Sequence, residues 1–206
     1  PKGKISYIAQ TGNFTGAMMR SIMTGEHYGV ARCIGLGNAV DIDEADVLEF
    51  LADDEETGAI FVYLESLHRP AAFLKTARRL TRRKPVIMLK GGATAEGAKA
   101  AMSHTASLGA DDRVLDGALA QAGIVRIEDF TQLFTVAKAA AMMPVPRGPR
   151  VGFVSPSGAF IVHASDICRA RTVLTFPKIA PATLKRLKEI SPPFINIGNP
   201  VDIFPS

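Results

Sequence analysis

Residues 85–110 read PVIMLKGGATAEGAKAAMSHTASLGA, and the rest of the chain is organised around this stretch. The apolar run 85–90 shows no alternation, which predicts a strand buried in a parallel sheet. The small-residue run that follows holds one histidine, His104, and is predicted to be a loop. Since open α/β sheets bind ligands beyond the carboxyl ends of their strands, this loop is expected at a ligand-binding edge.

The surroundings of His104 favour contact with a large or anionic group. Its neighbours are small, Ser103 and Thr105 supply hydroxyls, and Gly91 and Gly92 allow the backbone to approach an anion closely. From the residues alone, two interpretations stay open. His104 is either a reactive histidine or a hydrogen-bonded turn residue.

Outward from this stretch, apolar runs alternate with helical patterns. The expected strands are 4–10, 31–36, 59–64, 85–90 and 124–127, and the expected helices are 11–24, 44–52, 71–83, 111–122 and 128–142. Such an alternation predicts an α/β fold with a three-layer, flavodoxin-like parallel sheet and helices on both faces. Residues 1–143 are therefore assigned to one domain.

A second domain is predicted after a proline-rich linker at residues 144–149 (PVPRGP). The pattern restarts there, with a strand at 151–154, a turn at 155–158 and helices at 159–170 and 184–190, similar to the opening of the first domain. Residues 150–206 number about 57, fewer than the roughly 100 of a complete flavodoxin-like domain. They are interpreted as a partial second domain of a longer protein.

Two further features lie at predicted strand ends. Glu65 directly follows the strand 59–64, where it either meets a histidine across the crevice or caps the next turn. Gly12, Asn13 and Phe14 lie where the first strand turns into a helix, and free N–H groups at a helix N-terminus can bind phosphate. Packing alone also accounts for a glycine in that turn.

The second domain and the second strand carry weaker candidates. Ser157 and Gly158 lie at another expected helix N-terminus. Gly37, Asn38 and Asp41 follow the strand 31–36 in an acidic segment (AVDIDEAD, 39–46). The residues alone favour helix initiation for this segment, with Asp43 as the N-cap.

Composition excludes several classes of protein. No apolar run approaches the roughly 18 residues of a membrane-spanning helix, and no signal-peptide pattern is present, so a cytoplasmic location without membrane contact is expected. The net charge is +4, and the basic run at 78–84 carries no interleaved aromatic residues, which disfavours nucleic-acid binding. Cys33 and Cys168 are interpreted as core thiols, His163 as a packing residue, and His27 and His68 as surface or packing residues. No metal site is predicted.

Residues 103–108 (SHTASL) resemble the phosphohistidine loop of the nucleoside-diphosphate-forming acyl-CoA synthetases, relatives of succinyl-CoA synthetase. That loop usually reads Ser-His-Thr-Gly-Ser-Leu-Ala-Gly, so Ala106 replaces a glycine here. Four more segments resemble the family in the same order: 10–14 (QTGNF), 37–46 (GNAVDIDEAD), 63–65 (YLE) and 198–203 (GNPVDI). Ala39 replaces a lysine of the family pattern.

The resemblance implies a reaction and a role for each candidate. Acyl-CoA, phosphate and ADP would give acid, CoA and ATP through an acyl phosphate and a phosphohistidine. His104 would carry the phosphoryl group and Glu65 would orient it. The implied phosphate-binding residues are Gly12, Asn13, Phe14, Ser103, Thr105, Ser157 and Gly158, with Gly37, Asn38 and Asp41 lining the site.

The resemblance also implies partners for this chain. CoA and ATP or ADP with Mg²⁺ would serve the complete enzyme, with none held tightly by this chain alone. The CoA-binding and ATP-grasp domains or subunits would complete it, in a homo- or hetero-oligomer, and the isolated chain is expected to be inactive. One alternative is a non-catalytic regulatory module, as in some lysine acetyltransferases. A flavin or dinucleotide binder is disfavoured because no GxGxxG follows the first strand.

Overall fold

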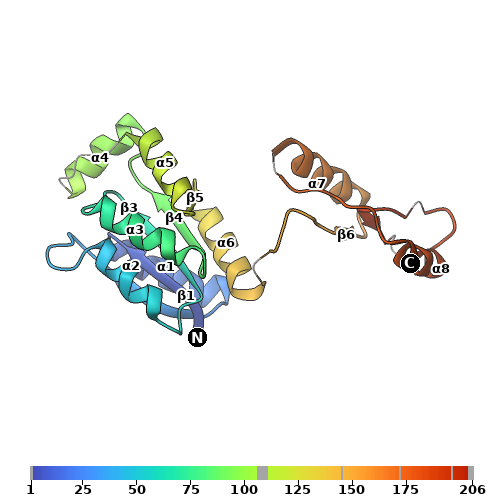
Figure 1. The fold of residues 1–206 in the computed structure, drawn as a ribbon, viewed down its shortest axis with the longest axis horizontal. Coiled ribbons are helices and arrows are strands. Elements are labelled where there is room, and N and C mark those ends of the chain that lie inside the picture. Colours follow the sequence, from blue (N-terminus) through green and yellow to red (C-terminus); the bar gives the residue numbers. More distant parts are fainter. Residues whose placement is uncertain (1, 106–110, 145, 172, 196, 204–206) are drawn as a thin grey trace. The chain divides into compact units, whose positions relative to one another are not determined.

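The computed structural model describes residues 2–105, 111–144, 146–171, 173–195 and 197–203, without the side chains of residues 14, 102–105 and 171. The chain divides into two compact units, Pro1–Pro144 and Val145–Ser206. Figure 1 shows the first unit as a sheet covered by helices on both sides.

In the described part of the first unit, all strands are parallel and form a five-stranded sheet in the order β2-β1-β3-β4-β5. The strands are β1 (Lys2–Ala9), β2 (Val30–Gly35), β3 (Ala59–Leu64), β4 (Val86–Lys90) and β5 (Val125–Ile127). The helices are α1 (Gly12–Ser21), which continues into the π-helical turn η1 (Ile22–Glu26), α2 (Glu44–Asp53), α3 (Pro70–Leu80), α4 (Ala95–Thr105), α5 (Asp112–Gln121) and α6 (Phe130–Met142). This confirms the predicted flavodoxin-like α/β fold.

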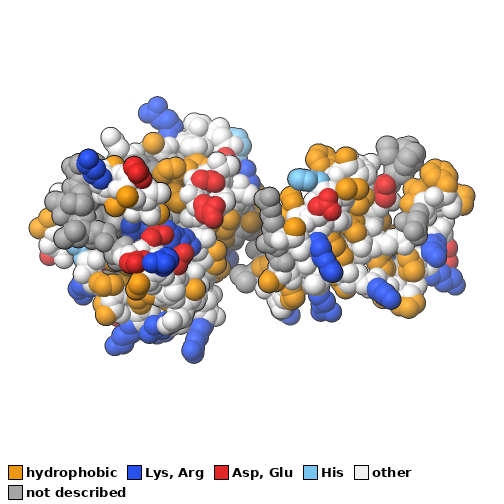
Figure 2. Space-filling view, turned by 90° about the horizontal axis from the view of Figure 1, so that it is seen from above, with side chains coloured by type: hydrophobic (Ala, Val, Ile, Leu, Met, Phe, Trp, Pro, Cys, Tyr) orange, Lys and Arg blue, Asp and Glu red, His pale blue; other side chains and the backbone are white. Residues whose placement is uncertain are grey.

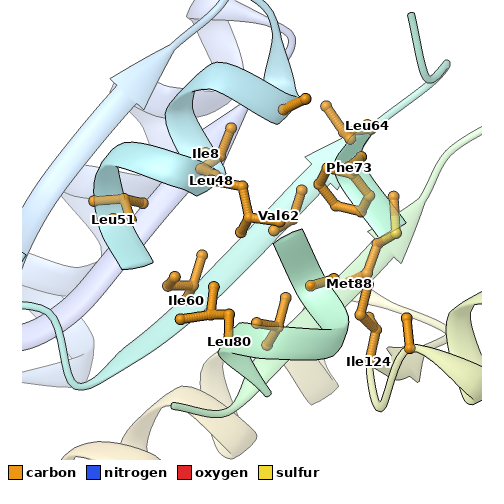
Figure 3. Packing of buried hydrophobic residues seen from close by; sticks show 14 of the residues in the cluster. Ile8, Leu48, Leu51, Ile60, Val62, Leu64, Phe73, Leu80, Met88 and Ile124 are labelled. Atoms are coloured by element: carbon orange, nitrogen blue, oxygen red, sulfur yellow. The ribbon is translucent and has the colours of Figure 1, made fainter. Parts of the chain in front are cut away.

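The sheet is buried on both faces by two separate hydrophobic clusters. Neighbouring residues on β3 divide between them: Ile60 and Val62 pack with α2, α3 and α5, whereas Phe61 faces the cluster built with α1 and α6. Figure 3 shows the first cluster, in which Leu48 and Leu51 of α2 and Phe73 and Leu80 of α3 meet the side chains of β3 and β4. Burial on both faces explains why the central strands are apolar without alternation.

Phe73 anchors α3 to the sheet, and its removal is expected to be strongly destabilising. Its side chain is 0% exposed, whereas Phe50 on α2 is 57% exposed. Phe73→Ala should lower the free energy of unfolding by about 3–5 kcal/mol, because it removes buried apolar surface and leaves a cavity. Phe50→Ala, the same change at an exposed position, should cost less than about 1 kcal/mol. Urea denaturation of the two variants makes the comparison, and equal losses would contradict the packing described.

One expectation is wrong: residues 95–105 are not a loop. They form α4, preceded by Thr94, whose hydroxyl accepts a hydrogen bond from the amide of Gly97 at 3.0 Å. The small residues taken as a loop signal are largely alanines, and alanine has the highest helix propensity. A capping threonine and four alanines in the first seven residues therefore outweigh the glycines. Residues 106–110 lie outside the described residues.

The second unit is small and carries little of the core. It contains β6 (Val154–Ser155), α7 (Gly158–Arg171), α8 (Pro181–Ile190) and β7 (Val201–Asp202), with β6 and β7 parallel. The expected strand at 151–154 is reduced to β6. Asn199 links this unit internally, since its amide donates to the carbonyls of Val151 (2.9 Å) and Pro177 (3.1 Å) and accepts from the amide of Phe153 (3.2 Å).

Hydrophobic side chains are exposed over much of the second unit, and Figure 2 shows them as orange patches among cationic residues. They include Phe160, Val162, Val173, Ile190 and Phe194. Among the described residues, Ile197 is the buried hydrophobic residue of this unit. The packing role expected for His163 is wrong, because this residue is exposed on α7. Of the two expected core thiols, Cys33 on the edge strand β2 is half-buried and packs against the second hydrophobic cluster. Cys168 on α7 is also only half-buried.

Candidate functional site

The strand order of the first unit defines where a ligand can bind. The chain leaves β1 for β2 on one side of the sheet and returns to β3 on the other, so the connections diverge at the carboxyl ends of β1 and β3. In open α/β sheets this divergence opens a crevice. Gln10 lies at this point, and its backbone N–H donates to the backbone carbonyl of Tyr63 at 3.0 Å.

A pocket of about 370 Å³ lies at this edge of the sheet. It combines residues that are far apart in sequence: Thr11 after β1, Tyr63 and Glu65 at the end of β3, Gly91 and Gly92 after β4, and Gly97, Ala100 and Ala101 on α4. Among these lining residues, Glu65 is the acidic one. The predicted strand-end acid and the predicted glycines are thus brought together, and α4 forms one wall.

Tyr63 supports the carboxylate of Glu65 from inside the pocket. Its hydroxyl donates to Oε1 of Glu65 at 3.2 Å, and its ring lies 5.8 Å from the ring of Phe130, centroid to centroid. Burial, and then the negative charge of Glu65, raise the pKa of Tyr63 to about 12. The phenol therefore stays protonated near neutral pH and keeps donating to the carboxylate.

Different structural constraints require glycine at the two positions after β4. A Cβ atom at Gly91 would lie 3.0 Å from the hydroxyl oxygen of Tyr63 and 3.2 Å from Cγ of Glu65, so a larger residue would displace both side chains. Gly92 has φ +74°, a conformation that side-chain-bearing residues rarely adopt. From the sequence, these glycines are expected to let the backbone approach an anion closely. The structure adds that Gly91 makes room for the acid itself.

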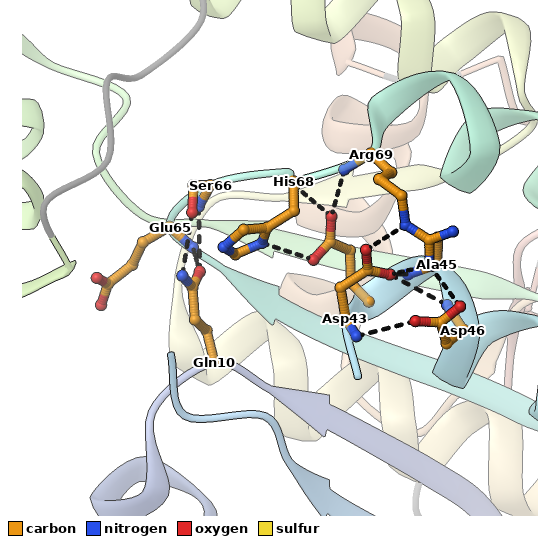
Figure 4. A network of polar contacts seen from close by, with 9 residues as sticks. Gln10, Asp43, Ala45, Asp46, Glu65, Ser66, His68 and Arg69 are labelled. Atoms are coloured by element: carbon orange, nitrogen blue, oxygen red, sulfur yellow. Dashed lines mark hydrogen bonds and ion pairs between the residues drawn. The ribbon is translucent and has the colours of Figure 1, made fainter. Parts of the chain in front are cut away.

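Gln10 holds the backbone of the acid. Its side chain is almost fully buried, and Oε1 accepts from the amides of Glu65 (2.8 Å) and Ser66 (3.1 Å). Its Nε2 donates to the hydroxyl of Ser66 at 3.0 Å. Figure 4 shows Gln10 beneath the β3–α3 loop, with the side chain of Glu65 pointing away from it.

A second contact holds the other end of the same loop. Glu44, the first residue of α2, is fully buried, and its carboxylate accepts from the amides of His68 and Arg69 and contacts Nδ1 of His68 at 3.1 Å. Arg69 pairs with Asp43 and Asp46 (Figure 4). His68, interpreted as a surface or packing residue, is therefore part of a polar network that joins α2 to the β3–α3 loop.

Asp43 caps α2 as predicted, in a reciprocal capping box with Asp46. It accepts from the amides of Ala45 (2.8 Å) and Asp46 (3.2 Å), and Nη2 of Arg69 donates to it at 2.8 Å. The bonds from Arg69, with help from the backbone amides, lower the pKa of Asp43 from 3.8 to about 2. The acidic segment after β2 therefore serves helix initiation at this residue.

This pKa predicts a loss of stability in acid. Because the folded pKa is lowered, the contribution of Asp43 is fully present above its unfolded pKa near 4 and is lost as the pH falls toward 2. The loss is expected to be about 2 kcal/mol between pH 5 and pH 2. Asp43→Asn should lack this component, whereas Asp53→Asn, at an exposed position of α2, should retain it. Urea denaturation at pH 5 and pH 2 tests this, and parallel losses in both variants would contradict it.

His104 belongs to the last turn of α4, whose backbone is described to Thr105. The side chains of Ser103, His104 and Thr105 lie outside the described part of the chain. Their roles stay predictions. Ala100 and Ala101, which line the pocket, lie one turn before His104 on the same helix.

The N-terminus of α1 lies between the Glu65 pocket and a second surface groove. Thr11 lines the Glu65 pocket, whereas Gly12 and Asn13 line a separate groove of about 730 Å³ that follows α1 and continues along η1 to Thr24. A Cβ atom at Gly12 would meet nothing within 4 Å, so this glycine is open to the surroundings. The backbone of Phe14 lies in the first turn of α1, and its side chain is outside the described residues.

The remaining candidates are not among the described residues that line the Glu65 pocket. Gly37, Asn38 and Asp41 are exposed in the β2–α2 loop, where Gly37 has φ +57° and Ala39 φ +49°. In the second unit, the amide of Ser157 donates to the hydroxyl of Ser155 at 3.1 Å, and Gly158 begins α7. Their roles in phosphate binding stay predictions.

Four residues that hold the loop of the acid were not predicted from the sequence: Gln10, Glu44, His68 and Arg69. A usable signal existed for the first two, because a glutamine at the end of an apolar strand and a glutamate behind a helix N-cap both indicate buried acceptors. Within the described residues, no group of three or more His, Cys, Asp and Glu side chains could hold a metal ion. No helix in the described part of the chain is both long and apolar enough to cross a membrane.

The first unit is thus a flavodoxin-like α/β domain with an acid-bearing pocket at its switch point. Residues 2–140 match the family described as succinyl-CoA ligase like flavodoxin domain. The chain belongs to this family, as the sequence resemblance implied.

Relatives of the chain include ADP-forming acetate–CoA ligases. It is 39% identical over 206 residues to acetate–CoA ligase [ADP-forming] II of Archaeoglobus fulgidus, covering 99% of this chain and 30% of the relative. It is 34% identical to the alpha subunit of acetate–CoA ligase [ADP-forming] I of Pyrococcus furiosus, covering 98% and 43%. The chain therefore spans less than half the length of these relatives.

Solved structures agree with this assignment. The dinucleotide forming acetyl-coenzyme A synthetase 1 of Ca. Korarchaeum cryptofilum, in complex with phosphate and ADP, matches with a TM-score of 0.91 and 31% identity. The match covers 98% of this chain and 44% of that one.

Proposed function

We propose that this chain is the phosphoryl-carrying part of an ADP-forming acyl-CoA synthetase, with His104 as the carrier and Glu65 as its orienting acid. The observation that carries the proposal is the Glu65 pocket. A carboxylate held by Tyr63 at the switch point of the sheet faces a wall formed by α4, and α4 ends in the His104 segment.

The chemistry follows from these groups. A phosphate oxygen attacks the thioester carbonyl, which releases CoA as a thiolate and forms an acyl phosphate. One imidazole nitrogen of His104 then attacks phosphorus, and the acid leaves as a carboxylate. The other imidazole N–H donates to Glu65, which selects the tautomer and stabilises the cationic ring. Transfer to the terminal phosphate oxygen of ADP gives ATP and returns the histidine to its neutral form.

The chain supplies backbone donors for the transferred group. Gly12, Asn13 and Phe14 begin α1, and Gly158 begins α7 next to Ser157, so each helix start presents backbone N–H groups and the positive end of its dipole. Ser103 and Thr105 flank the carrier, and Gly37, Asn38 and Asp41 are assigned to the outer part of the site. Residues 1–143 would carry the histidine, residues 144–149 would link the domains, and residues 150–206 would open the second ligase domain.

The complete enzyme needs more than this chain. CoA-binding and nucleotide-binding ATP-grasp domains or subunits would supply the other substrate sites, and Mg²⁺ would accompany ATP or ADP there. Relatives that are named as subunits support a multi-part, oligomeric enzyme. We place it in the cytoplasm, where CoA and ATP are available.

Phosphate mapping tests the proposal. The full-length protein is incubated with labelled ATP and Mg²⁺, and the label is tested for stability in base and lability in acid, as expected for phosphohistidine. Peptide mapping should find it on the peptide that contains His104. A folded protein that takes up no label contradicts the proposal and favours a non-catalytic module. Label on a different peptide contradicts the carrier role of His104.

A further inference from the structure

The β3–α3 loop, residues 65–69, is held by buried side chains at both ends. Gln10 accepts from the amides of Glu65 and Ser66, and Glu44 accepts from the amides of His68 and Arg69. Four of the five backbone amides of this loop, all but that of Leu67, thus donate to two side chains. Unpaired buried amides are costly, so the loop conformation depends on these two acceptors.

The two acceptors differ in what they control. Glu44 belongs to α2 and binds the far end of the loop, next to the ion pairs of Arg69. Gln10 binds the amide of Glu65 itself, at 2.8 Å. Both amide groups of Gln10 are fixed in turn. Its backbone N–H donates to the carbonyl of Tyr63, and its side-chain Nε2 donates to the hydroxyl of Ser66.

Gln10 also joins two parts of the site. It directly precedes Thr11, which lines the Glu65 pocket, and α1 begins one residue later at Gly12. A single side chain therefore connects the start of α1 with the backbone of the acid. Because Gln10 is neutral and only 4% exposed, it can set this distance without adding a charge that would perturb the carboxylate.

We propose that Gln10 is a positioning residue for phosphoryl transfer: it sets the place of the Glu65 carboxylate relative to the N-terminus of α1. This inference rests on the proposed function, since the position of Glu65 matters to catalysis only if Glu65 orients the phosphoryl carrier. Small misplacements of a catalytic group are expensive in rate. Loss of the Gln10 acceptor should therefore reduce the rate of transfer while substrate affinity stays the same.

Gln10→Met tests this in the full-length protein, because methionine keeps the length and loses the acceptor. The rate of base-stable, acid-labile phosphate formation at saturating ATP should fall by about 10- to 100-fold, with the KM for ATP unchanged. Gln132→Met is the matched control. It removes a similar bond, from the amide of Glu128 to Oε1 of Gln132 at 2.9 Å, on the exposed start of α6. Its rate should equal that of the wild type.

A double-mutant cycle separates positioning from a merely structural role. If Gln10 acts through Glu65, adding Gln10→Met to Glu65→Gln should cost less than about twofold further. If Gln10→Met fails to fold, Ser66→Ala takes its place, since it removes only the bond that fixes the Gln10 amide. That variant should lose about threefold in rate, with the same non-additivity.

The outcomes are distinguishable. A wild-type protein without phosphohistidine overturns the proposed function. If the wild type is phosphorylated, either of two results would overturn the positioning role alone. One is that Gln10→Met, or Ser66→Ala in its place, matches the wild-type rate. The other is that the substitution costs as much with Glu65→Gln as without it.

Discussion

The His104→Ala variant of the full-length protein is expected to incorporate no base-stable, acid-labile phosphate while keeping its fold. The proposed reaction has no other phosphoryl acceptor on the protein, so the loss of label should be complete rather than partial. Replacing a histidine near the end of α4 with alanine removes no helix-forming tendency, because alanine has the highest helix propensity. The thermal unfolding midpoint should therefore stay close to that of the wild type.

The matched control for this variant is His163→Ala. His163 is exposed on α7, so its removal should leave phosphate uptake at the wild-type level. Overall turnover of acyl-CoA should vanish together with the label in His104→Ala. Turnover that persists without label would mean that the phosphoryl group reaches ADP by another route, and the carrier role would be wrong.

The Glu65→Gln variant is expected to slow phosphohistidine formation by about 10²–10⁴-fold. Glutamine has nearly the same shape, and the amide of residue 65 would still donate to Gln10. The side chain, however, loses the negative charge that stabilises a developing imidazolium, and it can present an N–H that favours the wrong tautomer. The effect should therefore fall on the rate, with little change in the KM for ATP.

Rapid-quench measurement of phosphate incorporation provides the rate, and Glu49→Gln, on the exposed face of α2, is the control. The hydroxyl of Tyr63 can still donate to the amide oxygen of the new glutamine, so the pocket should keep its shape. A Glu65→Gln variant that reacts at the wild-type rate would leave the carboxylate without the proposed role, even if His104 carries phosphate.

Local sequence patterns predicted most elements of the first unit because each rests on short-range physics. The strand 59–64 is confirmed to the residue, and Asp43 caps α2, because an apolar run and an N-cap followed by an acid three residues later are local signals. The same reasoning failed at residues 95–105. A run of alanines between glycines satisfies both the loop and the helix pattern, and the cap at Thr94 decided for the helix.

Residue patterns along the chain were sufficient to predict the fold class, the family and the position of Glu65 at a strand end. The surroundings of that acid could not be predicted in this way, because they depend on how the elements pack. The pocket joins residues from the ends of β1, β3 and β4 with α4, and the loop is held by Gln10 and by Glu44. Gln10 and Glu65 are 55 positions apart in the sequence, and Glu44 and His68 are 24 positions apart. The physical reason is that strand order, not sequence distance, places the carboxyl ends of parallel strands side by side.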